Sequence, residues 1–250
     1  PRSTLFPYTT LFRSLAPSAE QMAPFRRNVP EGFTSPFEVY AATVTEMDRE
    51  LGRVLDALDT LGLARDTVVI FSSDNGPEDI EIGNATWSGV GSAGPLRGRK
   101  RSLYEGGTRV PFIVRWPGGG APSGQVNTGT VVSGADLLPT VCDVAGVALP
   151  EEVRAVQRGE SVAAAFRGDK GFMRQAPLMW EWRYRVFNHP WNRSPMLAIR
   201  EGRWKLLMNP DGGRVELYDI ERDPGEALNL AAAEGDRKST RLNSSHGKLS

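Results

Sequence analysis

The sequence predicts an α/β fold with a small antiparallel sheet at its C-terminal end. Apolar residues between Phe37 and Leu61 recur at helical spacing, and a β-branched run from Thr67 to Ser72 follows after a short connection. A polar loop comes directly after this run, as is usual where a strand of an α/β sheet ends. Beyond residue 175, four strand-like segments follow one another with only short turns between them, which favours antiparallel pairing.

The first helix and strand lead to the first candidate site. Gly62 is placed to end the helix that runs from Phe37 to Leu61. The run from Thr67 to Ser72 is predicted to be a buried strand. Ligands of α/β sheets bind beyond the carboxyl ends of the strands, and there the chain reads Asp74-Asn75-Gly76.

The remaining elements follow in order. Residues 76–107 form a loop region rich in Gly and Ser, with a basic stretch from Arg97 to Arg101. Asp136 is expected to cap a helix from Leu137 to Ala145, and Glu151 to Gly171 to hold a short helix. The predicted strands are Val110–Trp116, Leu178–Tyr184, Met196–Arg200, Trp204–Met208 and Val215–Asp219.

We divide the chain into five parts. Residues 1–14 and 236–250 resemble translated sequencing adaptors and are excluded from the fold, although polar disordered tails are an alternative reading. Residues 15–150 are assigned to an α/β domain, 151–174 to a linker and 175–235 to a small antiparallel subdomain.

Composition limits the possible functions. Without the two terminal segments the chain has 24 basic and 29 acidic residues, a net charge of −5, which gives no support for nucleic-acid binding. The single cysteine, Cys142, excludes an internal disulfide and a multi-cysteine metal site. No apolar run reaches the roughly 18 residues of a membrane span.

Two short motifs carry candidate chemistry. Asp74 and Asn75 offer adjacent oxygen ligands of the kind that Ca²⁺ and Mg²⁺ prefer, and Gly76 permits a sharp turn behind them. Lys100 supplies a cation that suits the oxygens of a sulfate or phosphate group. By themselves, an Asp-Asn-Gly sequence is also an ordinary turn and a basic stretch an ordinary solvated loop.

A series of motifs in one order makes the evidence specific, and it covers nearly all of the chain from Ser35 to Leu230. The motifs are Tyr40-Ala41, Val44-Thr45-Glu46-Met47-Asp48, Ser73-Asp74-Asn75-Gly76, Pro95-Leu96-Arg97-Gly98-Arg99-Lys100, Tyr104-Glu105-Gly106-Gly107-Thr108-Arg109-Val110-Pro111, Trp116-Pro117-Gly118, Asp136-Leu137-Leu138-Pro139-Thr140, Ala145-Gly146, Arg203-Trp204-Lys205-Leu206 and Glu216-Leu217-Tyr218-Asp219, closed by Asp223-Pro224, Glu226 and Asn229-Leu230. Together they resemble the sulfatase family of the alkaline-phosphatase-like superfamily. The resemblance implies a mixed sheet with flanking helices, here truncated.

The resemblance also implies roles for individual residues. Asp74 and Asn75 match the third and fourth ligands of a divalent metal, usually Ca²⁺, and Lys100 matches a sulfate-binding lysine. Glu105 and Arg109 fall at recurrent positions that we interpret as holding the loop rather than as catalytic. The substrate implied is a sulfate ester of a carbohydrate or an aryl alcohol, and a periplasmic or secreted location is favoured.

The departures from the family pattern are equally informative. The nucleophile of the family is a formylglycine made from Cys or Ser in a C-x-P/A-x-R motif, and Cys142 has no Arg four residues on. We therefore interpret Cys142 as a core cysteine. The paired aspartates, lysine and histidines that precede the matched region in the family have no counterpart here, so the chain is expected to be an inactive C-terminal part.

His189 is the one histidine outside the terminal segments and a candidate substrate contact. Trp180, Trp182 and Trp191 lie near it in sequence and suit a sugar-stacking surface, with ordinary packing as the alternative. Two other functions stay open: a phosphonate monoester or phosphodiester hydrolase of the same superfamily, and a non-catalytic binding module on the same fold.

Overall fold

The computed structural model describes residues 17–26, 35–80, 88–184 and 189–231. The chain forms two compact units. The first contains residues up to Gly62 together with Pro77–Ser92, and the second contains Leu63–Gly76 together with everything from Ala93 onward. The C-terminal sheet and the residues around position 104 share a core. The domain boundaries near residues 150 and 175 stay a prediction.

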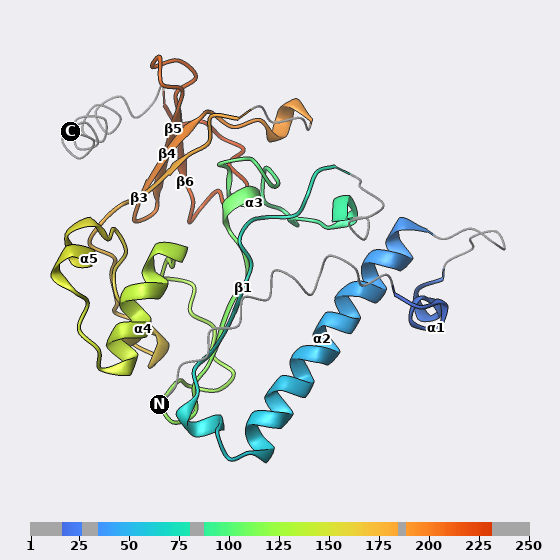
Figure 1. Cartoon of the computed structure of the whole chain (residues 1–250). Helices are drawn as coiled ribbons and strands as arrows, with labels where there is room; N and C mark the ends of the chain where they lie inside the picture. The colour runs from blue at the N-terminus through green and yellow to red at the C-terminus, as the bar shows by residue number, and fades with distance from the viewer. Residues whose placement is uncertain (1–16, 27–34, 81–87, 185–188, 232–250) are drawn as a thin grey trace. The chain divides into compact units, whose positions relative to one another are not determined.

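The first unit is built on helix α2, Pro36–Thr60, with the short helices α1 (Ala19–Met22), η2 (Ala23–Phe25) and η5 (Ser88–Val90). The Ser35 side chain caps α2, and Glu38 completes a capping box with Pro36 in the first turn. Gly62 ends the helical segment with a φ of +69°, a conformation open to glycine. The long helix that the sequence predicted is confirmed (Figure 1).

The second unit begins with η3 (Ala64–Asp66) and a pair of antiparallel strands, β1 (Val69–Ser72) and β2 (Phe112–Arg115). The prediction that this first strand is buried is wrong, since Val69, Ile70 and Phe71 are half-buried and Ser72 is exposed. A strand is buried on both faces only inside a wider, covered sheet, and among the described residues β1 pairs with β2 alone.

Short helices follow: α3 (Glu105–Thr108), η6 (Gly134–Asp136), α4 (Leu137–Ala145), α5 (Glu151–Val156) and α6 (Ala163–Phe166). Helix α4 is confirmed, but the prediction that Asp136 caps it with its side chain is wrong. Asp136 already has helical dihedrals because η6 precedes it, whereas a capping residue is usually extended. Its buried carboxylate instead accepts hydrogen bonds from the backbone N–H groups of Ser133 and Glu160 and pairs with Arg174.

Cys142 lies on α4 and is only half-buried, so the prediction of a core cysteine is also wrong. The buried face of this nine-residue helix is formed by Pro139 and Thr140, and Cys142 does not belong to it. A short helix that presents one narrow face to its neighbours leaves most of its residues partly exposed.

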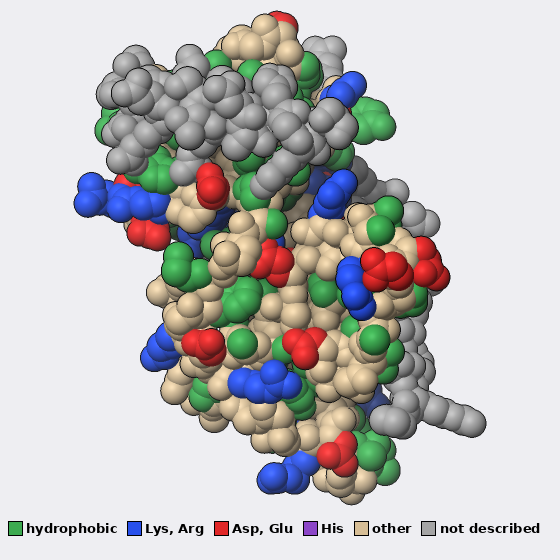
Figure 2. Space-filling model, turned by 90° about the vertical axis from the view of Figure 1, so that its left-hand side faces the viewer, with side chains coloured by type: hydrophobic (Ala, Val, Ile, Leu, Met, Phe, Trp, Pro, Cys, Tyr) green, Lys and Arg blue, Asp and Glu red, His purple; other side chains and the backbone are tan. Residues whose placement is uncertain are grey.

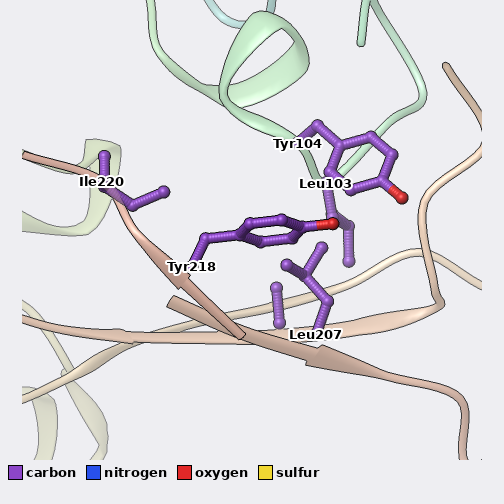
Figure 3. Close-up of a cluster of buried hydrophobic side chains, with 6 residues drawn as sticks. Leu103, Tyr104, Leu207, Tyr218 and Ile220 are labelled. Atoms are coloured by element: carbon purple, nitrogen blue, oxygen red, sulfur yellow. The ribbon is translucent and has the colours of Figure 1, made fainter. Parts of the chain in front are cut away.

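The C-terminal sheet has four antiparallel strands in sequence order, β3 (Leu178–Glu181), β4 (Leu197–Glu201), β5 (Trp204–Met208) and β6 (Glu216–Asp219), with η7 (Pro190–Asn192) between the first two. All four predicted strands are confirmed. Figure 3 shows Leu103 and Tyr104, from the loop before α3, packed against Leu207, Tyr218 and Ile220 of this sheet region. Residues that closely follow Lys100 in the sequence are therefore part of the hydrophobic core of this sheet.

The described surface carries charges of both signs. On the face shown in Figure 2, acidic and basic side chains are interspersed, without a continuous region of one sign. In the part of the chain that the structure describes, no helix is long and apolar enough to cross a membrane.

Candidate functional site

Asp74, Asn75 and Lys100 line one open cavity of about 570 Å³ in the second unit. Asp74 and Asn75 lie just beyond the carboxyl end of β1, and Lys100 comes from the loop that leads to α3. Residues about 25 positions apart in sequence are thus brought to one cavity. Asp74 is exposed, whereas Asn75 and Lys100 are half-buried.

Glycines allow these two segments to meet. The N–H of Gly76 donates to the carbonyl of Gly107 at 2.9 Å, and a Cβ on Gly76 would lie 1.8 Å from the carbonyl oxygen of Gly106. A Cβ on Gly106 would in turn lie 2.2 Å from the carbonyl oxygen of Gly98. Only residues without a side chain permit backbones to approach this closely. The turn that carries Asp74 is therefore attached directly to the segment that carries Lys100.

The donor atoms at the turn fit a hard divalent cation. The Nδ2 of Asn75 donates to the carbonyl of Gly76 at 2.9 Å, which leaves Oδ1 as the side-chain atom for a ligand. The Asp74 carboxylate beside it is an oxygen ligand too, and Ca²⁺ prefers such ligands. Among the described residues no group of three or more His, Cys, Asp or Glu could hold a metal. The pair could therefore supply at most two ligands of a coordination shell.

The loop that carries Lys100 is tightly turned. Gly98 has a φ of +87° and Arg101 a φ of +71°, and the N–H of Ser102 donates to the carbonyl of Arg99 at 3.0 Å. A left-handed conformation at a residue other than glycine costs energy and persists where its surroundings hold it. Lys100 lies between these two turns, so its position depends on what holds the loop at each end.

Arg97 holds the first end of the loop. Its guanidinium lies 3.8 Å from the centroid of the Tyr104 ring and 4.1 Å from that of Trp191. Its Nη1 donates to the hydroxyl of Tyr218 at 3.0 Å and to the carbonyl of Glu226 at 3.2 Å. Arg97 is thus packed and hydrogen-bonded on the C-terminal sheet side, and it does not line the cavity.

Two tyrosines and a carboxylate support the same end. The hydroxyls of Tyr104 and Tyr218 both donate to Oε2 of Glu216, at 2.7 and 2.9 Å. Burial first, and then the neighbouring Glu216 carboxylate, raise the pKa of Tyr104 and of Tyr218 above the usual range. Both tyrosines therefore stay protonated donors in this network at ordinary pH.

Glu105 holds the second end of the loop through a cluster of buried charges. Its Oε1 accepts a hydrogen bond at 2.9 Å from Nζ of Lys205, a residue of β5 that is 0% exposed. Its Oε2 lies 3.3 Å from Nη1 of Arg200 and 3.8 Å from Nη1 of the half-exposed Arg109. The contacts agree with the interpretation of Glu105 as a residue that holds the loop.

Glu226 completes this cluster and was not expected from the sequence as a site-supporting residue. Its Oε2 accepts a hydrogen bond from the backbone N–H of Glu105 at 2.6 Å, and its Oε1 lies 3.1 Å from Nζ of Lys205. Burial raises the pKa of Glu226 to about 7, against the opposing effect of Lys205. A charged Lys within the apolar strand Trp204–Met208 was the one available signal that such a buried partner exists.

The other walls of the cavity come from the η6 region and from β3. Ser133 and Gly134 line it, and the Asp136 carboxylate holds their backbone by accepting the Ser133 N–H at 2.7 Å. Trp180 and Trp182 line it as well, and both are partly buried against the core cluster of the C-terminal sheet. Ordinary packing thus accounts for part of their surface, and a sugar-stacking role stays a prediction.

The structure does not bring His189 to this cavity. His189 is exposed, and its Nδ1 accepts a hydrogen bond from the N–H of Trp191 at 3.2 Å at the start of η7. Trp191 stacks on Arg97 and likewise does not line the cavity. A substrate contact by His189 stays a prediction.

Comparisons with known proteins identify the family. A model described as sulfatase matches residues 10–147, and a model described as N-sulphoglucosamine sulphohydrolase, C-terminal, matches residues 98–245. Both matches reach into the terminal segments that resemble adaptors, so the adaptor interpretation stays a prediction.

Individual relatives and structures point the same way. A sulfatase of Formosa agariphila is 34% identical over 205 residues, which cover 77% of this chain and 35% of that protein. Steryl-sulfatase of Mus musculus is 45% identical over 130 residues, covering 52% of this chain and 20% of that protein. The structure of Ps i-CgsB in complex with k-i-k-neocarrahexaose is 27% identical with a TM-score of 0.67, covering 92% of this chain and 45% of that one. The chain thus spans about a third or less of the length of these two relatives.

Proposed function

Because the chain belongs to the sulfatase family and has its alkaline-phosphatase-like α/β fold, we propose that it is the C-terminal part of an enzyme that hydrolyses sulfate esters. The observation that carries the proposal is the meeting of Asp74, Asn75 and Lys100 on one cavity. A scaffold kept only for binding another protein has no physical need for two hard oxygen ligands beside a half-buried cation, so this trio also argues against a non-catalytic module.

The three residues have different roles toward the sulfate group. The ammonium of Lys100 binds the sulfate oxygens and stabilises the charge that builds up on them in the transition state. Asp74 and Asn75 contribute oxygen ligands to a divalent cation, Ca²⁺ in the usual family pattern. Such a cation, when bound, withdraws electron density from the sulfate oxygens that it contacts.

The substrate proposed is a sulfated carbohydrate or an aryl sulfate. Trp180 and Trp182 are among the residues that line the cavity of Lys100, and aromatic walls suit a sugar ring or an aryl group. The similar Ps i-CgsB structure contains an oligosaccharide, which supports the carbohydrate class. A phosphonate monoester or phosphodiester substrate would use the same three residues, so it is an outcome of the test below.

The chain supplies no residue that matches the nucleophile. Cys142 lies on α4, outside the lining of the cavity. We propose that the formylglycine, the remaining metal ligands and the acid for the leaving group come from the part of the longer enzyme that precedes the matched region. A periplasmic or secreted location stays part of this proposal.

The test uses the longer enzyme, obtained by extending the reading frame upstream. We expect Lys100→Ala to lower kcat/KM for an aryl sulfate by about 100- to 1,000-fold, the size of effect found when one transition-state cation or donor is removed. Arg99→Ala is the matched control, because Arg99 is the neighbouring base in the same loop but does not line the cavity. An equal loss for both variants, or no loss for Lys100→Ala, would contradict the proposal. A higher kcat/KM for the matching aryl phosphate or phosphonate would reassign the substrate.

A further inference from the structure

We infer that Lys205 and Glu226 of the C-terminal region are positioning residues for Lys100. They act by fastening the loop of residues 97–107 onto the C-terminal sheet. The inference rests on the proposed function for its catalytic consequence, but the fastening itself can be measured without any activity. The inference gives the C-terminal sheet a role in holding Lys100, although the two are far apart in the sequence.

The cluster of Lys205, Glu226 and Glu105 is buried away from water. Lys205, Glu226 and Glu105 are 0%, 0% and 2% exposed. Lys205 is the only one of them on a strand of the sheet, and its Nζ lies 2.9 Å from Oε1 of Glu105 and 3.1 Å from Oε1 of Glu226. Removing one partner of the Lys205–Glu105 pair leaves an uncompensated charge away from water, which is strongly destabilising.

The cluster holds backbone groups as well as side chains. Glu226 accepts the N–H of Glu105, the first residue of α3, at 2.6 Å. The next residue, Gly106, donates its N–H to the carbonyl of Arg97 at 2.6 Å, and Gly107 accepts the N–H of Gly76 at 2.9 Å. A short path of hydrogen bonds thus leads from Lys205 to the loop of Lys100 and to the turn of Asp74 and Asn75.

Glu226 itself has an unfavourable backbone conformation. Its φ of +52° lies in the left-handed region, which is unfavourable for a residue with a side chain. The same residue fixes the other end of the loop, because its carbonyl accepts Nη1 of Arg97 at 3.2 Å. One strained, fully buried residue therefore contacts both ends of the segment that carries Lys100.

The first experiment measures hydrogen exchange in the longer enzyme, where the amides of these residues are followed. We expect Lys205→Met and Glu226→Ala to speed amide exchange across residues 97–107 by roughly tenfold or more, while the amides of β4 and β5 keep their protection. Glu226→Gln keeps an acceptor for the Glu105 N–H and should restore most of the protection. Arg203→Met is the matched control, since Arg203 pairs with Asp219 in the same sheet and does not contact the loop.

The outcomes of this experiment separate the possibilities. If Lys205→Met does not fold, the comparison of Glu226→Ala with Glu226→Gln decides the question. Unchanged exchange of the loop in Glu226→Ala, or equal loosening in the Arg203→Met control, would overturn the inference.

The second experiment is a double-mutant cycle in the longer enzyme. We expect Glu226→Ala to lower kcat/KM for the aryl sulfate by at least about tenfold in the wild-type background but by less than about twofold in the Lys100→Ala background. Glu226→Gln should keep most of the activity. An equal loss in both backgrounds would show that Glu226 acts only on general stability and would overturn the positioning role. If Lys100→Ala alone has no effect, the proposed function fails, and the exchange experiment still decides whether the loop is fastened.

Discussion

At the scale of single residues, the sequence predicted candidate site residues but not the contacts that support them. Asp74, Asn75 and Lys100 were recognisable because motif order identifies them, and the structure places all three on one cavity. Lys205 and Glu226 lie in recognisable motifs too, but their pairing with Glu105 joins positions about 100 or more residues apart. No local pattern encodes which distant carboxylate a buried lysine meets, so this part could not be predicted.

Glu226 gives a prediction on the pH dependence of stability. Its pKa is raised from 4.5 to about 7, mainly by burial, with Lys205 of β5 and Glu105 of α3 as its charged neighbours. A raised pKa means that the folded chain holds the proton more tightly than the unfolded chain. The stability contributed by this proton is complete below about pH 4.5 and is lost as the pH rises through about 7.

We therefore expect Glu226→Gln to gain stability relative to the wild type between pH 5 and pH 8, by up to about 3 kcal/mol. The measurement is urea unfolding at several pH values. Glu151→Gln, which changes an exposed glutamate of α5, should follow the wild-type curve. Parallel curves for Glu226→Gln and the wild type would show that Glu226 is ionised throughout this range.

At the scale of elements, periodicity predicted helices and strands well. The helix α2, the helix α4 and the four strands of the C-terminal sheet all follow the predicted positions within a few residues. The predictions that failed concern the surroundings of an element. The burial of β1 depends on which strands lie beside it, and the role of Asp136 depends on η6, a short turn that no apolar periodicity marks.

The junction between the β1 turn and α3 supports a second prediction. A Cβ on Gly106 would lie 2.2 Å from the carbonyl oxygen of Gly98 and 2.6 Å from that of Arg97, and both contacts are with backbone. We expect Gly106→Ala to destabilise the chain by about 1–3 kcal/mol, because the loop of Lys100 must shift to make room. Thermal or urea unfolding measures the loss.

Gly134→Ala is the matched control for this prediction. Gly134 lies in the same unit and also lines the cavity, but an added Cβ would meet nothing within 4 Å. We expect its effect to stay within about 0.5 kcal/mol of zero. Equal stability of the two variants would mean that the close approach at Gly106 is not required.

At the scale of the whole molecule, the proposed function makes this chain one side of an active site. It spans 20–35% of the length of the two relatives described above. Among the described residues, β1 has one strand partner, and Ile113 of β2 is 59% exposed. An α/β sheet normally covers such strands on both faces, so we expect low solubility of the chain when it is expressed alone.

The same incompleteness predicts that the chain alone is catalytically inactive. Hydrolysis needs a nucleophile held against sulfur, a cation opposite the developing charge and an acid for the leaving oxygen. Under the proposed function, the matched residues would supply two metal ligands and one sulfate-binding cation. Because Ca²⁺ takes about 6–8 oxygen ligands, two protein ligands should bind it only weakly.

The test is to express residues 15–235 and to assay an aryl sulfate and an aryl phosphate in the presence of Ca²⁺, with calorimetric titration of the metal. We expect no turnover above background, and Ca²⁺ binding no tighter than about the millimolar range, where sites with few charged ligands lie. Lys100→Ala is the control that identifies the site, because any activity of contaminating enzymes is independent of it. Turnover of either ester that this substitution abolishes would mean that the residues of this chain suffice for the chemistry, and that the nucleophile is among them.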